Sequence, residues 1–534
     1  MLDLFIQGAT VYDGTLEPPK KLDIGIENGK ILVSPLDTQA KKTIDAKGLC
    51  LTPGFIDMHS HGDMTLGAEY AKLSKISQGI TTEMVGHCGS SMYPVDPNAL
   101  ELYYTLMSVG TKFYSEDTPN WNSFARYLEH VERTPRATNM KFLIGHGAVR
   151  LAVMGYENRI PTEAEMEEMK KYVREAMEHG AYGLSTGLVY TPSSFATMEE
   201  IIELAKIVGE YGGIYATHMR NESYDSLKSI TEAIEIARQS NTMLNISHHK
   251  IFGQKNWGLS TETLKLIQSA IDEGMKVTID QYPYDASYTH LNVCIPPWHF
   301  TDGIPALAKR LKEDSEFRAL VQREMEDENS PFDNLLLNSG GYSGIFLSSF
   351  PVTTEAEGYY LTEYAEKIGM TPYDAFCYLM IENDGVGTAI YHSIGEEDMF
   401  RIIQNPNTVV GTDGNCRAFQ EKGHPRSFGT FPRAIRYYHK EKQLFSLEEI
   451  IHKITMLTAE RLQLKTKGRI ADGMDADLVL FNYDTLNDNP TYSESNQLCD
   501  GIEYVIVNGE ISYQDKKLTG VNAGQILLHT NEGN

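Results

Sequence analysis

Short runs of alternating apolar and polar residues lie at both ends of the chain. Near the N-terminus they cover residues 4–8, 22–27 and 31–33, and near the C-terminus 476–481, 502–507 and 510–513. Asn-Gly pairs at 28–29 and 508–509 separate neighbouring runs. A period of two interrupted by such turns is typical of β-hairpins. We therefore expect the two ends to form one small β domain, separated in sequence by a long middle segment.

The middle segment alternates apolar, strand-like runs with amphipathic helices. The runs begin near residues 55, 81, 140, 182, 214, 243, 276 and 408. Helices are predicted between several of them, at residues 162–180, 197–212, 225–238 and 261–274. The first two helices begin with capping boxes, formed by Thr162 with Glu165 and by Thr197 with Glu200. Repeats of about 30 residues match the βαβ unit, and eight such strands predict a (β/α)8 barrel.

Two intervals between the predicted strands are too long for a simple barrel connection. They cover residues 89–139 and 289–407. The second contains a charged helical stretch at 306–326. Because long insertions at the mouth of a barrel often cover the active site, we expect residues 289–345 to form an inserted lid.

Composition and charge exclude several classes of protein. The 534 residues are 41% apolar and 22% charged, as in a globular protein, and the net charge is −26. A surface this negative argues against binding to nucleic acid or to anionic membranes. Six scattered cysteines and the absence of a long apolar run favour a cytoplasmic protein. The sequence is also compatible with a homo-oligomer.

Residues able to bind a metal ion follow five of the predicted barrel strands, where barrels place their active sites. They are His59 and His61, Cys88, His218, the pair His248 and His249, and Asp413. Two residues apart on a strand, His59 and His61 would face the same side. Adjacent residues face opposite sides, so only one of His248 and His249 can face the barrel axis. So many potential ligands at strand ends are difficult to explain by packing alone, and they predict a metal site.

These residues lie within segments that resemble the amidohydrolase superfamily, and within it the N-acyl-D-amino-acid deacylase (D-aminoacylase) family. The similar segments run through almost the whole chain: PGFIDMHSHGD (53–63), GITTEMVGHCGSSMYP (79–94), GAYGLSTGLVYTP (180–192), ATHMRNE (216–222), ISHHK (246–250), DQYPYDAS (280–287), GTDG (411–414), HPRSFGTFPR (424–433) and KGRIADGMDADLVLF (467–481). The resemblance implies a barrel at 53–464 and a small β-sandwich domain built from 1–52 and 465–534.

The resemblance also implies the roles of the metal-binding residues. Cys88, His218 and His248 would hold one tightly bound zinc ion, and His59, His61 and Asp413 a second, weaker site. The 30-residue spacing from His218 to His248 favours His248 over His249, which would then point outward to the helices. Three protein ligands leave one zinc position for water, which the metal would activate as hydroxide. Asp413 would act as general base and then as general acid.

Four further residues are expected to bind the substrate. Lys250, two residues beyond His248, would pair with the free carboxylate of an N-acyl amino acid, and Tyr190 and Tyr282 would donate hydrogen bonds to carbonyl or carboxylate oxygens. Tyr288 stands where the family has serine, and it would shrink the side-chain pocket or offer a hydroxyl. His87 replaces an asparagine of the family, and we expect it to form hydrogen bonds beside the metal. Arg220 and Arg426 are further cationic candidates, with a salt bridge as the expected role of both.

The sequence therefore predicts a zinc-dependent hydrolase that cleaves the amide bond of N-acyl-D-amino acids or similar small N-acyl compounds. An alternative is hydrolysis of a cyclic amide, such as a hydantoin or dihydropyrimidine, or of an unusual dipeptide. A third is a metal-binding scaffold without catalysis, although such a protein has no need of Asp413.

Overall fold

The two ends of the chain form one sheet in a computed structural model that describes residues 1–95, 120–416, 418–419 and 421–530. Its strand order is β20-β19-β18-β17-β5-β1-β2-β3, with β4 paired to β1. The strands are β1 Leu2–Val11, β2 Lys20–Glu27, β3 Lys30–Val33, β4 Ala40–Asp45, β5 Cys50–Pro53, β17 Leu478–Phe481, β18 Ile502–Val507, β19 Glu510–Gln514 and β20 Lys517–Leu518. The prediction that both ends form a common β region is confirmed.

Eight parallel strands form a nearly closed barrel in the middle of the chain. They are β6 Phe55–Asp57, β7 Ile80–Val85, β8 Asn139–Gly145, β9 Gly183–Gly187, β10 Ile214–His218, β11 Met243–Ile246, β12 Val277–Gln281 and β16 Thr408–Val410. The two outer strands, β6 and β16, approach each other just beyond their ends, where the Asp413 amide donates to the His59 carbonyl at 2.7 Å and Ser60 bridges to Gly414. The barrel prediction is confirmed. Residues 96–119 of the long interval 89–139 lie outside the described residues.

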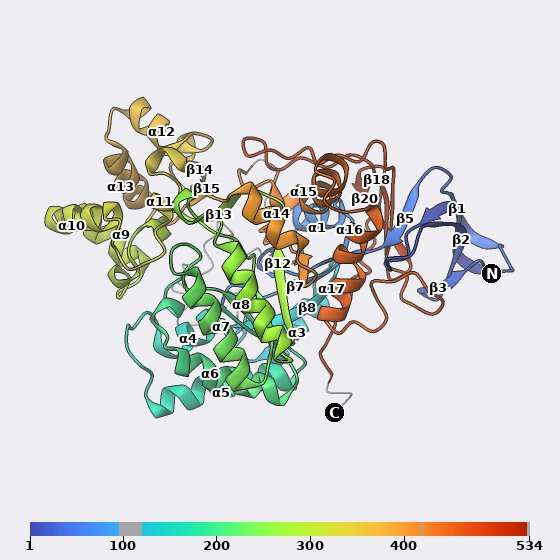
Figure 1. Ribbon diagram of the computed structural model, residues 1–534, viewed down its shortest axis with the longest axis horizontal. Helices are drawn as coiled ribbons and strands as arrows, with labels where there is room; N and C mark the ends of the chain where they lie inside the picture. The colour runs from blue at the N-terminus through green and yellow to red at the C-terminus, as the bar shows by residue number, and fades with distance from the viewer. Residues whose placement is uncertain (96–119, 417, 420, 531–534) are drawn as a thin grey trace.

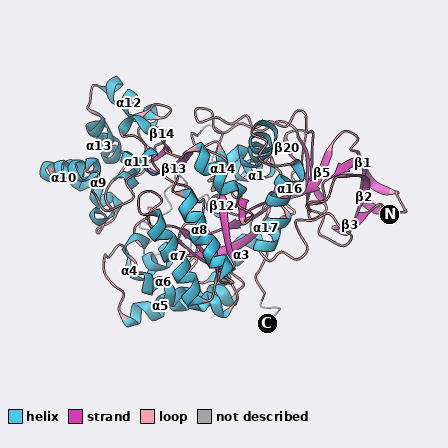
Figure 2. Ribbon diagram, viewed as in Figure 1, coloured by secondary structure: helices cyan, strands magenta, loops and turns pink. Residues whose placement is uncertain are grey.

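Amphipathic helices follow the barrel strands and cover them from outside (Figure 2). They include α1 Glu69–Ile76, α3 Phe124–Arg133, α4 His146–Met154, α5 Glu163–Glu178, α6 Met198–Glu210, α7 Ser226–Ser240, α8 Ser260–Asp272 and α14 Glu396–Gln404. After the last strand come α15 Arg426–Arg433, α16 Leu447–Ile454 and α17 Met456–Arg461. The capping box predicted for α5 is present. The one predicted for α6 is wrong in part: Thr197 caps the helix, but the Glu200 side chain is buried and pairs with Arg150 and His146.

A separate lobe is inserted between β12 and β16. Its three-stranded antiparallel sheet contains β13 Ala286–His290, β14 Ile345–Ser349 and β15 Thr388–His392. Its helices are α9 Ile304–Glu313, α10 Ser315–Glu326, α11 Leu335–Asn338, α12 Leu361–Ile368 and α13 Pro372–Glu382. The single helix predicted at 306–326 is therefore two helices, because Asp314 ends α9 and caps α10. Figure 1 shows this lobe and the terminal sheet on opposite sides of the barrel.

The expected lid segment, 289–345, lies within this inserted lobe, which we define as residues 286–392. This lobe follows the carboxyl end of β12, and α14 leads from it back to the start of β16, so the lobe lies beside the barrel opening. A membrane-spanning helix is not present in the described part of the chain, since none of its helices combines the required length and apolar character.

Candidate active site

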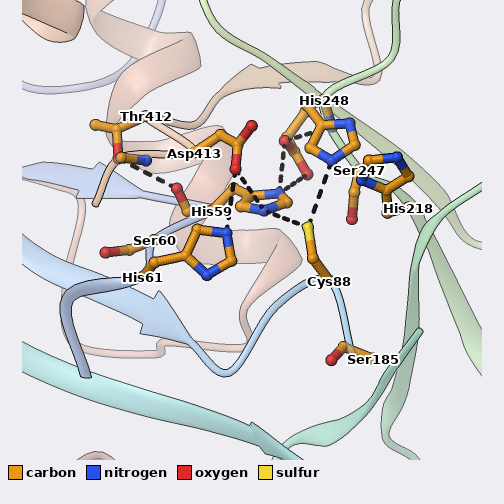
Figure 3. Close-up of polar contacts among 12 residues, drawn as sticks. His59, Ser60, His61, Cys88, Ser185, His218, Ser247, His248, Thr412 and Asp413 are labelled. Atoms are coloured by element: carbon orange, nitrogen blue, oxygen red, sulfur yellow. Dashed lines mark hydrogen bonds and ion pairs between the residues drawn. The ribbon is translucent and has the colours of Figure 1, made fainter. Parts of the chain in front are cut away.

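The predicted ligand residues meet at the carboxyl end of the barrel (Figure 3). Cys88 Sγ lies 3.4 Å from His59 Nε2 and also 3.4 Å from His248 Nε2. Asp413 Oδ1 lies 3.4 Å from His59 Nε2 and 3.1 Å from His61 Nε2. The His218 ring packs edge-on against His248, with 4.4 Å between ring centroids. Six residues from five strand ends therefore lie in one buried cluster. Within it, Cys88 lies between His59 and His248.

Three residues of this cluster have a left-handed backbone. The φ angles of Cys88, His248 and Asp413 are 54°, 36° and 48°. Non-glycine residues rarely adopt this region, and doing so costs about 1–3 kcal/mol each. Hydrogen bonds hold two of them in place: the His248 amide donates to Asp280 at 2.7 Å and the Asp413 amide to the His59 carbonyl at 2.7 Å. The fold thus maintains unfavourable backbone conformations that turn these side chains into the barrel mouth.

The donor atoms of His59, Cys88, His248 and Asp413 all lie within 4.8 Å of one another, close enough to hold one zinc ion, whereas His218 groups with Glu222 and His248. Around a tetrahedral zinc, bonds of about 2.0–2.3 Å place ligand nitrogen and sulfur atoms about 3.5 Å apart, close to the separations at Cys88. Burial lowers the pKa of His59, His218 and His248 well below its usual value, which keeps these imidazoles neutral as ligands must be. Burial, followed by the carboxylates of Asp413 and Asp280, raises the pKa of the Cys88 thiol. A thiolate at this position therefore requires a nearby cation.

Asp413 is held as an ionised carboxylate. Burial opposes ionisation, but the Arg426 guanidinium and a hydrogen bond from His61 outweigh it and hold the pKa of Asp413 well below its usual range. Arg426 lies 2.8 Å from Asp413 Oδ2, so this carboxylate has one oxygen toward the arginine and the other toward the histidines. An ionised carboxylate beside a metal site can accept a proton from water.

A cavity of about 360 Å³ opens above this cluster, and a smaller one of about 20 Å³ lies deeper against it. The four residues expected to bind substrate, Lys250, Tyr190, Tyr282 and Tyr288, all line the smaller cavity, together with His218, His248 and Arg426. The Tyr282 hydroxyl has no hydrogen-bond partner among the described residues. The Tyr190 hydroxyl lies 2.9 Å from Thr289 Oγ1, and that of Tyr288 donates to Thr388 Oγ1 at 3.0 Å.

Known proteins resemble this chain over its whole length. A model of the amidohydrolase family matches residues 42–287 and 374–513. A D-aminoacylase from Alcaligenes xylosoxydans xylosoxydans is 35% identical over 530 residues, which is 99% of this chain and 98% of that one. An N-acyl-D-aspartate deacylase from the same organism is 33% identical over 98% of this chain and 95% of that one. The chain belongs to the amidohydrolase family.

Solved structures agree with membership of the amidohydrolase family. A D-aminoacylase crystal structure superposes with a TM-score of 0.82 at 32% identity, covering 99% of this chain and all of that one. An N-acyl-D-glutamate deacylase from Bordetella bronchiseptica, solved with zinc and a phosphonate inhibitor, superposes with a TM-score of 0.81 at 30% identity over 99% of this chain and 100% of that one. A D-hydantoinase, at 15% identity and a TM-score of 0.54, shares the fold. This chain is therefore an amide-bond hydrolase within the N-acyl-D-amino-acid deacylase branch of the family.

Sequence reasoning missed two buried carboxylates that organise the amidohydrolase cluster. Asp280 Oδ1 lies 3.1 Å from His59 Nδ1, while Asp280 Oδ2 accepts from Asn245 at 2.7 Å. Glu222 pairs with Lys250 at 2.7 Å, and Lys250 Nζ also lies 2.7 Å from His248 Nδ1. Carboxylates that orient metal-binding histidines are common in metalloenzymes. Asp280 was recognisable in principle, because it lies one residue before the end of β12, the one barrel strand of the second half that lacked a candidate ligand.

The remaining predictions have mixed outcomes. His249 points outward, as predicted, with Nε2 2.9 Å from Thr263 of helix α8. The hydrogen bonds predicted for His87 are wrong for the described part of the chain: the buried ring stacks on His59 at 3.9 Å instead, and neither ring nitrogen has a partner there. The salt bridges predicted for the two arginines are confirmed, Arg220 with Glu232 at 3.0 Å and Arg426 with Asp413.

Proposed function

We propose that this amidohydrolase cleaves N-acyl-D-amino acids to a carboxylate and a free D-amino acid, with zinc as its metal. The observation that carries the proposal is the buried cluster of thiol, imidazole and carboxylate groups beside a cavity of substrate size, in a chain whose full-length relatives carry this activity. We assign Cys88, His218 and His248 to the tightly bound zinc, and His59, His61 and Asp413 to a second, weaker site.

When bound, zinc would lower the pKa of water and polarise the amide carbonyl. Side chains of the protein would carry out the proton transfers. Asp413, ionised and close to His61 and His59, accepts the proton of the attacking water and later delivers it to the departing nitrogen. This second transfer is necessary because an amine anion is a very poor leaving group.

The cations and hydroxyls of the deeper cavity would orient the substrate. Lys250 and Arg426 are both buried there, although each already pairs with a carboxylate, Glu222 and Asp413. We assign the substrate carboxylate to these two cations, together with the Tyr282 hydroxyl. Burial raises the pKa of Tyr282, so this hydroxyl stays protonated and can donate. Tyr190, whose ring packs 4.9 Å from the His218 ring, lies where the amide carbonyl would approach, and Tyr288 contributes its ring to the wall.

The first test is release of free amine from a panel of N-acetyl-D- and N-acetyl-L-amino acids, using protein whose zinc content has been measured. Release from D substrates alone is the expected result. Equal or exclusive release from L substrates would overturn the assignment of stereochemistry. Silence of the zinc-loaded protein on this panel, with addition of water to a hydantoin detected by mass, would instead establish cyclic-amide hydrolysis.

A further inference from the structure

The large cavity beside the metal-binding cluster has an apolar wall. The inserted lobe supplies most of this surface. The residues are Val293, Ile295, Pro297, Trp298, Phe300, Ile304 and Phe332, with Leu188 and Met64 added by the barrel. Trp298 and Phe332 meet edge to face, with 5.8 Å between ring centroids, so the aromatic part of the wall is packed rather than open. A substrate group that reaches this wall exchanges water for aromatic and aliphatic carbon.

The charged side chains that line the same cavity form salt bridges with one another. Arg220 donates to Glu232 through Nε and Nη2, to the Ser194 carbonyl and to the Ala196 carbonyl, which occupies four of its five N–H groups. Lys228 lies 3.6 Å from Asp225 and its side chain is 83% exposed, at the rim. These are the cations that line the larger cavity in the described part of the chain, apart from Arg426 beside Asp413.

Carboxylates at the cavity would repel a second negative charge. Asp225, Glu232 and Asp333 all line it. Asp333 is buried and accepts hydrogen bonds from the Glu222 amide at 2.8 Å and the Ser223 hydroxyl at 2.7 Å. An acidic substrate side chain would meet these carboxylates and would find Arg220 already paired with Glu232, and burial of an unpaired charge is strongly unfavourable.

We propose that the inserted lobe selects substrates by an uncharged, apolar substituent that lies against Trp298, Phe300 and Phe332, and that acidic side chains are rejected. This inference rests on the proposed deacylase function and narrows it. It separates this chain from its relatives that act on N-acyl-D-aspartate and N-acyl-D-glutamate. The apolar substituent can belong to the amino-acid side chain or to the acyl group, since both extend from the scissile amide.

A substrate panel tests the proposal and identifies the source of the apolar group. We expect kcat/KM for N-acetyl-D-phenylalanine or N-acetyl-D-leucine to exceed that for N-acetyl-D-aspartate and N-acetyl-D-glutamate by about 100-fold or more. Preference for N-octanoyl-D-alanine over N-acetyl-D-alanine would assign the wall to the acyl chain. Equal or faster turnover of the acidic substrates, or of N-acetyl-D-lysine, would overturn the inference while leaving the deacylase function intact.

Binding measurements test the role of the apolar wall even if no substrate of the panel is turned over. The dissociation constants of D-phenylalanine, N-octanoyl-D-alanine and D-aspartate can be measured by calorimetry with the zinc-loaded protein. At least tenfold tighter binding of one of the apolar compounds than of D-aspartate supports the apolar wall, whereas tighter binding of D-aspartate refutes it. Absence of turnover would count against the proposed function alone.

A pair of tryptophan variants locates the effect in the lobe. Trp298→Ala should lower kcat/KM for the preferred apolar substrate at least tenfold more than for N-acetyl-D-alanine. Activity retained on N-acetyl-D-alanine also shows that the variant is folded. Trp298→Phe should give a smaller loss of the same kind. Trp257→Ala is the matched control, because Trp257 is 46% exposed and does not line the cavity. Equal losses on both substrates for Trp298→Ala and Trp298→Phe would remove Trp298 from selection.

Discussion

The barrel mouth and the inserted lobe meet at one cavity but are built in opposite ways. At the mouth, each important side chain follows a strand of a parallel barrel, carries a polar or charged group, and is fixed by a buried partner such as Asp280 or Arg426. The lobe contributes apolar and aromatic side chains from its loops and short helices. The amidohydrolase model matches residues on both sides of 288–373 and omits that stretch, which contains most of the lobe.

This difference separates chemistry from selection. A group that binds metal or moves a proton acts on every substrate, whereas an apolar wall acts only on substrates that reach it. Changes at the barrel mouth should therefore lower turnover of all substrates by the same factor. Changes in the lobe should alter the ratio between substrates. The predictions below test this separation, beginning with the largest expected effect.

Replacing Cys88 should abolish activity on every substrate. Its sulfur lies 3.4 Å from both His59 Nε2 and His248 Nε2, so Cys88→Ala removes the donor atom that lies beside both imidazoles. We expect zinc content to fall well below that of the unmodified protein and amine release to reach background, as measured by metal analysis and by the substrate panel. The matched control is Cys377→Ala, another buried cysteine, in helix α13 of the lobe. Full zinc content in the Cys88 variant would contradict the assignment.

Asp413→Asn should separate metal binding from proton transfer. The amide cannot accept a proton, and we expect kcat to fall by about 10²–10⁴-fold, equally for apolar and small substrates. Zinc assigned to Cys88, His218 and His248 should remain, since none of these ligands is changed. Metal content and kcat measured on the same preparation provide the check. Nearly normal turnover would exclude Asp413 as the general base.

A smaller effect is expected for Asp280, the carboxylate beside His59 and the His248 amide. Asp280→Asn weakens the acceptor for His59 Nδ1 and for the His248 amide, and losing such support typically costs about 10–100-fold in metal affinity or activity. Competition with a chelator would measure the change in zinc affinity. Asp272→Asn, at the exposed end of α8, is the matched control. If both variants behave alike, Asp280 has no special role in orienting the histidine.

The barrel and its cluster were predictable because each depends on local sequence. Strand starts near 214 and 243 follow from apolar runs of the right spacing, and His218 and His248 then lie at matching strand ends. Parallel pairing brings those ends together without further information. Side-chain alternation predicted that only one of His248 and His249 faces the barrel axis, and the 30-residue spacing from His218 favoured His248, so His249 was expected to point outward.

Contacts between distant segments were not predictable in this way. Glu200 fits a capping box by its spacing from Thr197, but its side chain pairs with the buried Arg150 of helix α4, a partner 50 residues away. His87 next to Cys88 suggested hydrogen bonding, whereas ring stacking on His59 depends on the approach of two strand ends. The wall formed by Trp298 and Phe332 carries no motif, because apolar packing of this kind is satisfied by many sequences.

Tyr288 lies on the border between the two regions and should give the smallest effect. Its ring lines the cavity, but its hydroxyl donates to Thr388 Oγ1 at 3.0 Å, which joins β13 to β15 inside the lobe. Tyr288→Phe keeps the ring and should change kcat/KM by about threefold or less, while losing about 1 kcal/mol of unfolding free energy with the hydrogen bond. Thr388→Val should cost a similar amount, and the double variant little more than either single one, as measured by urea unfolding. A loss of tenfold or more in kcat/KM for Tyr288→Phe, with stability unchanged, would instead place this hydroxyl on the substrate and make Tyr288 part of the chemistry at the barrel mouth.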